Sequence, residues 1–467
     1  MSVLSTMKII DKGKTMLNNN LKAKTGMPII LLITALLFAM SCKECPTEPE
    51  DPDLSLSAPY LETSIVWLKI SSSESTTSKS FIVQRDTIVV LESSFHGKDT
   101  LIADRTVQPN TSYTYTLNYV DHGKIQDETE SVTITTLDIS NSDFTWEVYR
   151  FGDEGNENWF RSVSIVNENN IWIVGTFRCW GWDSLYSAYG YVPYNTVHWN
   201  GTNWDTVSIA PKPFGFSSLD AVCAINDSVV WAGVDAIVQL KNGQWLARTD
   251  SPDLSWMMDI WGNSVSNTYF AYYDGGIVHF NGTSFEIMSS GTTTNLQDID
   301  GNDERVFITG FKTTIGYDKL LLEYKNGQWQ KVFTSSTASG DLSNGDLGRP
   351  YSVKALDDVA VISTAAAATV KYYYHDGIMD IWPEKATPLC NYVSVERIDG
   401  NAINDLALIT NGGQVVHYNG RDYTTVFDYD VSGYSGDPSI YGGDFKDDVI
   451  CAVGDVLGQA LVIIGRR

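Results

Sequence analysis

Basic residues are scarce in this sequence, and their scarcity limits the partners that it can have. The 467 residues contain 32 Lys and Arg against 57 Asp and Glu, which gives a formal net charge of −25. A field of that sign repels phosphate backbones and anionic lipid surfaces. We therefore expect no nucleic-acid partner, and contact with a membrane only through a lipid anchor.

Charged residues of either sign are also few, at 19%, whereas the hydrophobic fraction is 43% and the aromatic fraction 12%. These are values of a globular chain and they exclude disorder as its general state. Frequent Gly (37), Tyr (24) and Trp (14) favour short strands and tight turns over helices. The length exceeds what one hydrophobic core usually organises, so we predict an all-β chain with two or more domains.

Motifs that carry chemistry are missing as well. The sequence has no nucleophile motif, no phosphate-binding loop and no zinc-protease pattern. One position of the repeat described below carries His198, His279 and His417, which belong to different units and lie too far apart to share a metal. We expect no metal and no cofactor. Four cysteines beyond the N-terminal region form no metal-binding spacing and are predicted to be buried free thiols: Cys179, Cys223, Cys390 and Cys451.

One long apolar run stands near the start of the chain, at Pro28–Met40. It is too short to cross a hydrocarbon layer about 30 Å thick as a helix, so it predicts the core of a signal peptide over residues 1–41. Ala39, Met40 and Ser41 precede Cys42 and resemble the end of a lipobox, which implies that Cys42 is lipidated. The alternative is an ordinary secretory signal followed by a spare cysteine.

The segment after the predicted cleavage point is rich in proline and acids. Residues 42–54 therefore read as an extended, solvated tether. Its Cys-Lys-Glu start is similar to the export signals that send bacterial lipoproteins to the outer cell surface. These resemblances imply an extracytoplasmic lipoprotein, held at the outer membrane or cell surface by several acyl chains.

Residues 55–138 show short strands with period-two alternation, separated by turn signals, which predicts a β-sandwich. The segment resembles a fibronectin type III domain at two points. Trp67 stands on the second strand, where that family has its core tryptophan. Residues around Tyr113 resemble the tyrosine corner, in which a tyrosine hydroxyl ties back to the chain upstream: Val107, Pro109, Thr111, Tyr113 and Tyr115. We expect this domain to act as a spacer.

A repeat of about 46 residues fills the region 142–467 and predicts a β-propeller. Its clearest mark is an aromatic-Asn-Gly or Lys-Asn-Gly hairpin, as in HWNGTNW at 198–204 and YKNGQW at 324–329. Seven apolar second strands follow one another, yet the last unit lacks a fourth strand. The segment 144–152, with Trp146, has the form of that missing strand and would close a seven-bladed ring. The unit resembles repeats of uncharacterised secreted bacterial propellers, which implies the fold and no activity.

The long loops nominate one face of this propeller for binding. Loops between second and third strands and connections between blades emerge on the same face, where the insertions 177–195 and 336–350 fall. Flat aromatic rings beside carboxylates suit stacking on sugars or gripping a peptide. The candidate ligand-binding residues are Trp180, Trp182, Asp183, Tyr186, Tyr189, Tyr191, Tyr194, Phe214, Phe216, Tyr434 and Asp437. An alternative is that the first insertion folds on itself and caps the ring.

Three functions remain open from the sequence. The first is a binding or adhesion protein whose loop face engages a glycan or protein ligand. The second is a polysaccharide hydrolase or lyase that pairs carboxylates such as Asp183 and Asp437 as acid and base. The third is a structural part of an envelope complex. No catalytic residues are assigned.

Overall fold

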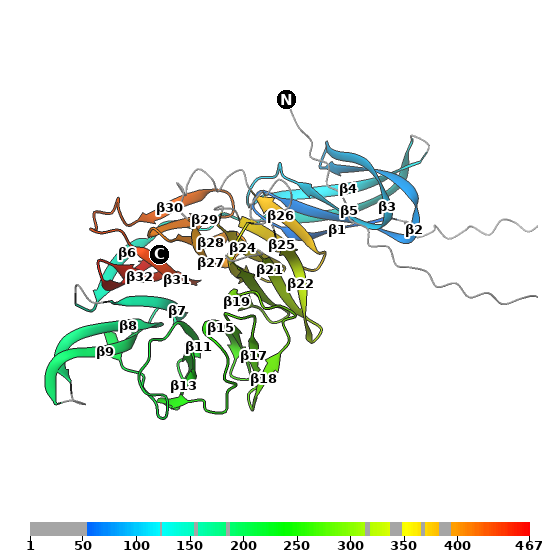
Figure 1. Cartoon of the computed structure of the whole chain (residues 1–467). Helices are drawn as coiled ribbons and strands as arrows, with labels where there is room; N and C mark the ends of the chain where they lie inside the picture. Colours follow the sequence, from blue (N-terminus) through cyan, green and yellow to red (C-terminus); the bar gives the residue numbers. More distant parts are fainter. Residues whose placement is uncertain are drawn as a thin grey trace, which may run out of the picture. The chain divides into compact units, whose positions relative to one another are not determined.

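The computed structural model describes residues 54–121, 124–153, 157–183, 187–312, 318–336, 348–365, 369–382 and 394–467. The predicted signal peptide, Cys42 and all of the tether except Leu54 lie outside the described residues. The chain divides into two compact units, Met1–Asp51 and Pro52–Arg467, and everything described below belongs to the second. Its elements are all strands (Figure 1), which confirms the all-β prediction. None of the described residues forms a helix that is long and apolar enough to span a bilayer.

The first five strands form a sheet that folds over on itself. They are β1 Leu54–Leu61, β2 Val66–Arg85, β3 Ile88–Asp104, β4 Ser112–Asp121 and β5 Lys124–Thr135. The first part of β2 pairs with β1 and with the end of β3, whereas its second part pairs with the start of β3 and with β4. The two parts enclose one core, in which Leu68 and Ile70 pack with Phe81 and Leu117.

Two features of this N-terminal domain were predicted from single residues, with different outcomes. The backbone N–H of Gln108 donates to the Tyr113 hydroxyl oxygen at 3.0 Å, which is the predicted tie to the chain upstream. The placement of Trp67 in the core of the sandwich is wrong. Because side chains alternate along a strand, Val66 and Leu68 point into that core and Trp67 points away from it. Its ring lies 5.2 Å from that of Tyr373, in a cluster shared with the rest of the chain.

Seven four-stranded antiparallel sheets make up the described part of the remaining chain. Sheets one to three contain β7 Trp159–Asn167, β8 Asn170–Asp183, β9 Ala188–Trp199, β10 Trp204–Val207; β11 Ala221–Asn226, β12 Val229–Gly233, β13 Ile237–Lys241, β14 Gln244–Ala247; and β15 Met257–Ser264, β16 Asn267–Tyr272, β17 Ile277–Phe280, β18 Phe285–Met288. Sheets four to six contain β19 Leu296–Gly301, β20 Val306–Phe311, β21 Lys319–Lys325, β22 Gln328–Ser335; β23 Pro350–Ala355, β24 Val359–Thr364, β25 Thr369–Tyr373, β26 Ile378–Trp382; and β27 Val395–Ala402, β28 Asp405–Thr410, β29 Gln414–Tyr418, β30 Tyr423–Asp428. Sheet seven contains β31 Ser439–Lys446, β32 Val449–Val456, β33 Gln459–Arg466 and β6 Thr145–Phe151.

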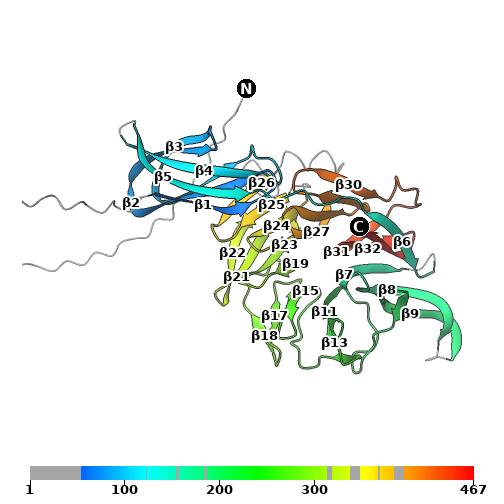
Figure 2. The ribbon, with the colours of Figure 1, turned by 180° about the vertical axis from the view of Figure 1, so that it is seen from behind.

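These sheets close into a circle, so this part of the chain is a β-propeller, as predicted (Figures 1 and 2). The first strand of each sheet contacts the first strand of the next, and β31 of the last sheet contacts β7 of the first. The second strands are mostly apolar, and β20 and β24 are buried along their whole length, because neighbouring sheets cover both of their faces. The short β14 at the rim alternates between exposed and half-buried residues.

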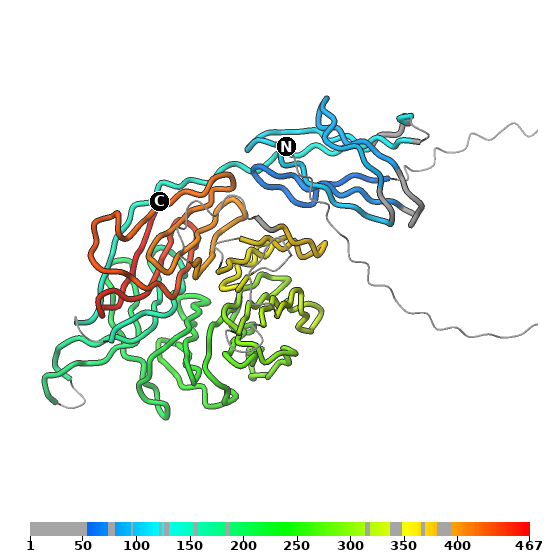
Figure 3. Tube along the Cα trace, turned by 45° about the horizontal axis from the view of Figure 1, so that its top comes forward, coloured from blue at the N-terminus to red at the C-terminus, as the bar shows by residue number. Residues whose placement is uncertain are grey.

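The last sheet joins the two ends of the propeller sequence. Strand β6 pairs antiparallel with β33, so that Trp146 lies opposite Gly465 and Val148 opposite Ile463. Figure 3 shows this early strand beside the C-terminal strands. The pairing is the one that the incomplete last repeat predicts, and it removes two exposed sheet edges.

The hairpins marked by Asn-Gly are of two kinds. Asn242 and Gly243 both have positive φ, 53° and 74°, as the expected two-residue type I′ turn requires. The hairpin at Asn200 has a four-residue loop instead, because the Asn200 side chain accepts hydrogen bonds from the backbone of Thr202 and Asn203. The same sequence mark therefore gives two turn geometries.

The N-terminal domain packs against sheets five and six of the propeller. The Tyr60 ring lies 4.8 Å from that of Tyr373, and both belong to a buried cluster with residues of β24, β27 and β28. The Glu62 carboxylate accepts hydrogen bonds from Lys371, at 2.5 Å, and from the Tyr373 hydroxyl. Thr63 donates to the backbone of Gly420, in the hairpin between β29 and β30.

Candidate functional site

The two faces of the propeller differ in what covers them. One face carries the links between the first and second strands of each sheet, together with the Asn-Gly hairpins, and we call it the turn face. We call the opposite face the loop face. The N-terminal domain contacts the turn face, at Gly420 and at Asp376. The loop face carries the hairpin of β8 and β9, which contains the first predicted insertion.

The strands β8 and β9 continue pairing beyond the first sheet and form a long hairpin (Figures 1 and 2). Trp180 lies opposite Tyr191 and Trp182 opposite Tyr189, so all four rings share one face of this hairpin. The ring centroids of the two pairs are 5.2 and 5.4 Å apart. We call these four residues the hairpin patch.

The rings of the hairpin patch are open to solvent. Trp180 is 61% exposed, Trp182 56%, Tyr189 70% and Tyr191 50%. Two cross-strand aromatic pairs normally stabilise a sheet by burying apolar area, yet these leave at least half of each residue in water. A contiguous exposed aromatic surface of this kind is typical of a binding surface. The Asp153 carboxylate holds the hairpin at its base, because it accepts a hydrogen bond from the backbone N–H of Trp180 at 2.6 Å.

The other predicted site residues are not part of the hairpin patch. Tyr194 stacks on the buried Phe177 and packs in the core of the first sheet, since it has the opposite strand parity to Tyr189 and Tyr191. Tyr434 stacks on Tyr429 at 5.3 Å. The remaining candidates are Asp183 at the end of β8, the exposed Phe214 and Phe216 in the link to sheet two, and the exposed Asp437. Tyr186 and residues 337–347 of the second insertion lie outside the described residues.

A pocket opens where the first strands of the sheets begin, and no pattern in the sequence predicted it. It has a volume of about 280 Å³, and we call it the mouth pocket. All seven sheets contribute residues to its lining. Sheet two contributes only Asp220, which directly precedes β11. The lining residues are Arg161, Asp220, Trp256, Met257, Met258, Tyr273, Gln297, Tyr351, Glu396, Arg397 and Tyr441.

Two carboxylates in the mouth pocket are partly desolvated. The Trp256 indole N–H donates to Asp220 at 2.5 Å, and the Ser394 hydroxyl donates to Glu396 at 2.5 Å. Burial raises the pKa of Asp220 and the pKa of Glu396 above their usual values. The guanidinium of Arg161 lies over the Tyr441 ring at 4.3 Å.

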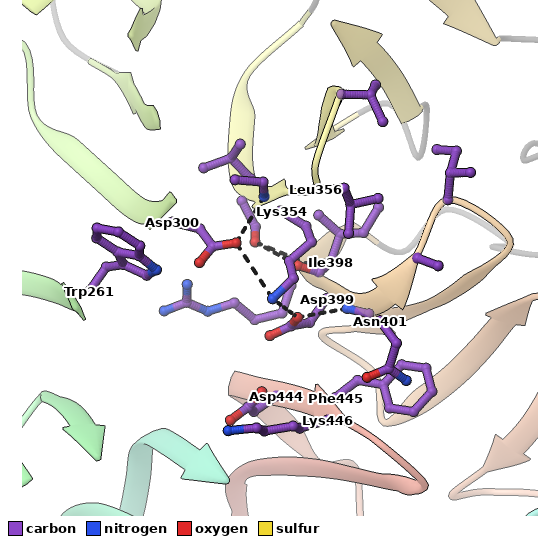
Figure 4. Close-up of a pocket in the computed structure, with 18 of the residues that line it drawn as sticks. Trp261, Asp300, Lys354, Leu356, Ile398, Asp399, Asn401, Asp444, Phe445 and Lys446 are labelled. Atoms are coloured by element: carbon purple, nitrogen blue, oxygen red, sulfur yellow. Dashed lines mark hydrogen bonds and ion pairs between the residues drawn. The ribbon is translucent and has the colours of Figure 1, made fainter. Parts of the chain in front are cut away.

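The central channel below the mouth pocket holds further charged residues (Figure 4). Its cavity has a volume of about 830 Å³. Lys354 forms ion pairs with Asp300 and Asp399, at 3.5 and 2.7 Å. Arg397 pairs with Asp259, at 3.2 Å, and with Asp298.

Many of these channel side chains also bind the backbone of the next sheet. The Asp298 carboxylate accepts a hydrogen bond from the Val353 N–H at 2.7 Å, and Asp300 accepts one from the Ala355 N–H at 2.8 Å. Ser164 binds the N–H of Ala224 in the same way. Because the first strand of each sheet is an edge strand, its free N–H groups need such acceptors. The channel charges therefore hold neighbouring sheets together.

The histidines and cysteines have structural surroundings. His198 and His279 contact Asn170 and Asn267, each within its own sheet, and the buried His417 contacts Asp405 at 2.8 Å. Among the described residues, no three His, Cys, Asp or Glu side chains are placed to hold a metal ion. The described cysteines are free thiols, but only Cys451 is buried as predicted, whereas Cys179 and Cys223 are half-buried. Cys390 lies outside the described residues. Burial raises the pKa of the Cys223 thiol to about 12.

Comparisons with known proteins find likeness in structure only. No known protein family matches the sequence, and no curated protein does. Among solved structures, one described as YCF48 bound to D1 peptide is 12% identical over 68% of this chain and 94% of that chain, with a TM-score of 0.49. The WD40 β-propeller domain of Doa1 is 12% identical over 70% and 98%, with a TM-score of 0.44. The computationally designed Ika8 protein is 10% identical over 67% and 98%, with a TM-score of 0.43. This likeness concerns the β-propeller fold alone.

Proposed function

We propose that this chain is a lipid-anchored, extracytoplasmic binding or adhesion protein, in which a fibronectin type III-like sandwich carries a seven-bladed propeller. In this proposal Cys42 bears the lipid, residues 42–54 form the tether, and the loop face of the propeller meets a glycan or protein ligand. The observation that carries the proposal is the hairpin patch: four aromatic rings, at least half exposed, on one face of a long hairpin.

The hairpin patch suits binding for a physical reason. Tryptophan and tyrosine offer large, rigid apolar faces at little entropic cost, together with polar groups at their edges. Sugar rings and peptide side chains can both stack on such faces. The packing of the N-terminal domain on the turn face is consistent with this use, since that domain would stand between the anchor and the propeller.

Binding is favoured over hydrolysis by the state of the carboxylates. The acids of the central channel are paired with Lys354 and Arg397 and accept backbone N–H groups, so they serve the packing of sheets. Asp183 and Asp437, the acids named from the sequence, lie in separate segments, at the end of β8 and in the link before β31. The channel acids are therefore engaged in structural contacts and are not free to act as the acid and base of glycoside hydrolysis.

The test is a glycan and protein-ligand screen with a soluble form that begins at Pro52, the start of the compact unit. Replacing Trp180 and Trp182 with alanine should abolish a hit, while the protein keeps its thermal stability because both side chains are exposed. The matched control is Ile88→Ala with Val89→Ala, which removes two exposed apolar side chains from the sandwich. Retention of the hit in the tryptophan variant, or equal loss in the control, would contradict the proposal.

The anchor is tested separately in cells. Cys42→Ser should release the full chain from membranes, as measured by fractionation, because the acyl chains then have no attachment point. Membrane association that survives this change would mean that the lipid anchor is not what holds the protein.

A further inference from the structure

The mouth pocket is a second place on the loop face where a ligand can enter. It lies where the first strands of the sheets begin, whereas the hairpin patch extends from sheet one. None of its lining residues belongs to the hairpin patch. What the pocket could hold follows from the chemistry of its walls.

Aromatic rings form much of those walls. Trp256 is 50% exposed and Tyr273 46%, and their ring centroids are 6.5 Å apart. Tyr351 and Tyr441 contribute from sheets five and seven. The faces of such rings carry partial negative charge and attract cations.

Two carboxylates stand among these rings, and the hydrogen bonds found for them come from neutral groups. Asp220 is bound by the Trp256 indole and Glu396 by the Ser394 hydroxyl. Burial disfavours their charged forms, which is seen in their raised pKa values. A cation that entered the pocket would offset this cost.

The two arginines of the pocket do not cancel that attraction. Arg397 is paired inside the channel with Asp259 and Asp298. Arg161 lies against the Tyr441 ring and is near enough to Asp220 to lower the pKa of that carboxyl, yet burial still dominates there. Within the part of the chain that the structure describes, no Lys or Arg forms an ion pair with Glu396, whose carboxylate accepts a hydrogen bond from the Ser394 hydroxyl.

We propose that the mouth pocket binds an arginine side chain of a protein or peptide ligand. A guanidinium fits this site better than other groups because it is planar, stacks on aromatic faces and donates two parallel hydrogen bonds to a carboxylate. The ring of Trp256 provides the stacking face and Glu396 the acceptor. The inference rests on the proposal that the loop face binds ligands, but it does not require the hairpin patch.

The experiment uses fluorescence anisotropy of a labelled peptide with one arginine between glycine and serine residues, and a matched peptide with citrulline in its place. Citrulline has nearly the same shape without the charge. The arginine peptide should bind the full-length protein about tenfold more tightly than the citrulline peptide, because one hydrogen bond to a charged group is worth at least that ratio.

Variants then locate the binding. Glu396→Gln and Trp256→Ala should each weaken binding of the arginine peptide about tenfold. Asp143→Asn is the control, since it removes one negative charge from an exposed position outside the pocket and outside the predicted binding residues. The Trp180 and Trp182 variant separates the two proposals, because it should leave this binding unchanged.

Equal binding of the two peptides, or equal loss in Glu396→Gln and Asp143→Asn, would show only general attraction to an acidic protein and would overturn the inference. Loss of glycan or protein binding in the hairpin variant together with intact binding of the arginine peptide would support both sites independently. Failure of the arginine peptide to bind at all would remove the mouth pocket and leave the hairpin patch standing.

Discussion

Replacing Lys371 with methionine tests how the N-terminal domain is held on the propeller. The Lys371 and Glu62 side chains are only 1% and 3% exposed, and their charged atoms lie 2.5 Å apart. Methionine keeps most of the side-chain volume but leaves the Glu62 carboxylate buried without its counter-charge. Removing one partner of such a pair costs about 3–5 kcal/mol. We expect a loss of that size in the free energy of unfolding, measured by urea denaturation and tryptophan fluorescence.

A second lysine of the same interface provides the control. Lys69 pairs with Asp376 at 2.8 Å, but its side chain is 29% exposed, so water screens the pair. Lys69→Met should therefore cost about 0–1 kcal/mol. Adding Glu62→Gln to Lys371→Met should recover part of the loss, since no buried charge then remains. If Lys371→Met costs no more than Lys69→Met, the buried pair does not stabilise the docking and the reasoning is refuted.

Two further predictions concern the propeller itself. Trp146→Ala removes the β6 ring whose centroid lies 4.9 Å from that of Phe427 in the neighbouring sheet. It should lower the free energy of unfolding by about 2 kcal/mol or more in the same urea assay, and an unchanged midpoint would mean that the last sheet does not need β6. The pKa of Asp300 is raised to about 6, chiefly by burial, so the folded state binds its proton more tightly than the unfolded state does. The stability that this group contributes is therefore highest below pH 4 and falls by about 3 kcal/mol as the pH rises to 6. Asp300→Asn should flatten that decline in thermal unfolding between pH 4 and 7, and an identical pH profile would contradict it.

The strand pattern and its closure could be predicted because they depend on local signals. Positive φ at Asn242 and Gly243 is a property of the residues in the turn, and so is the apolar run of β20. A count of the repeats showed that the last one lacks a fourth strand. The segment 144–152 was identified as that strand because Trp146 stands at the aromatic position of the repeat. The pairing of the hairpin aromatics also follows from period two, which in addition puts Tyr194 on the face opposite to Tyr189.

The wrong prediction for Trp67 concerned the face of the sheet on which the side chain lies, and not the existence of the strand. Trp67 was assigned to the core of the sandwich because the segment resembles a fibronectin type III domain, which has its core tryptophan on the second strand. It is buried, but against Tyr373 of the propeller, since its neighbours Val66 and Leu68 already fill the inner face. A strand covered on both sides has two apolar faces, and its own sequence does not say which partner covers each.

The sequence by itself determined the all-β class, the repeat, the chain segment that completes the last sheet and the long loops on one face, because each follows from residues near one another in the chain. Only the tertiary structure decided what lies in the middle of the ring. The mouth pocket joins Asp220, Trp256 and Glu396, and the channel joins Lys354 with Asp300 and Asp399, from different sheets. Each residue by itself is an ordinary strand or turn residue. Closure of the ring brings them together. The surroundings then have a low dielectric constant, which strengthens electrostatic interactions such as the ion pairs between neighbouring sheets.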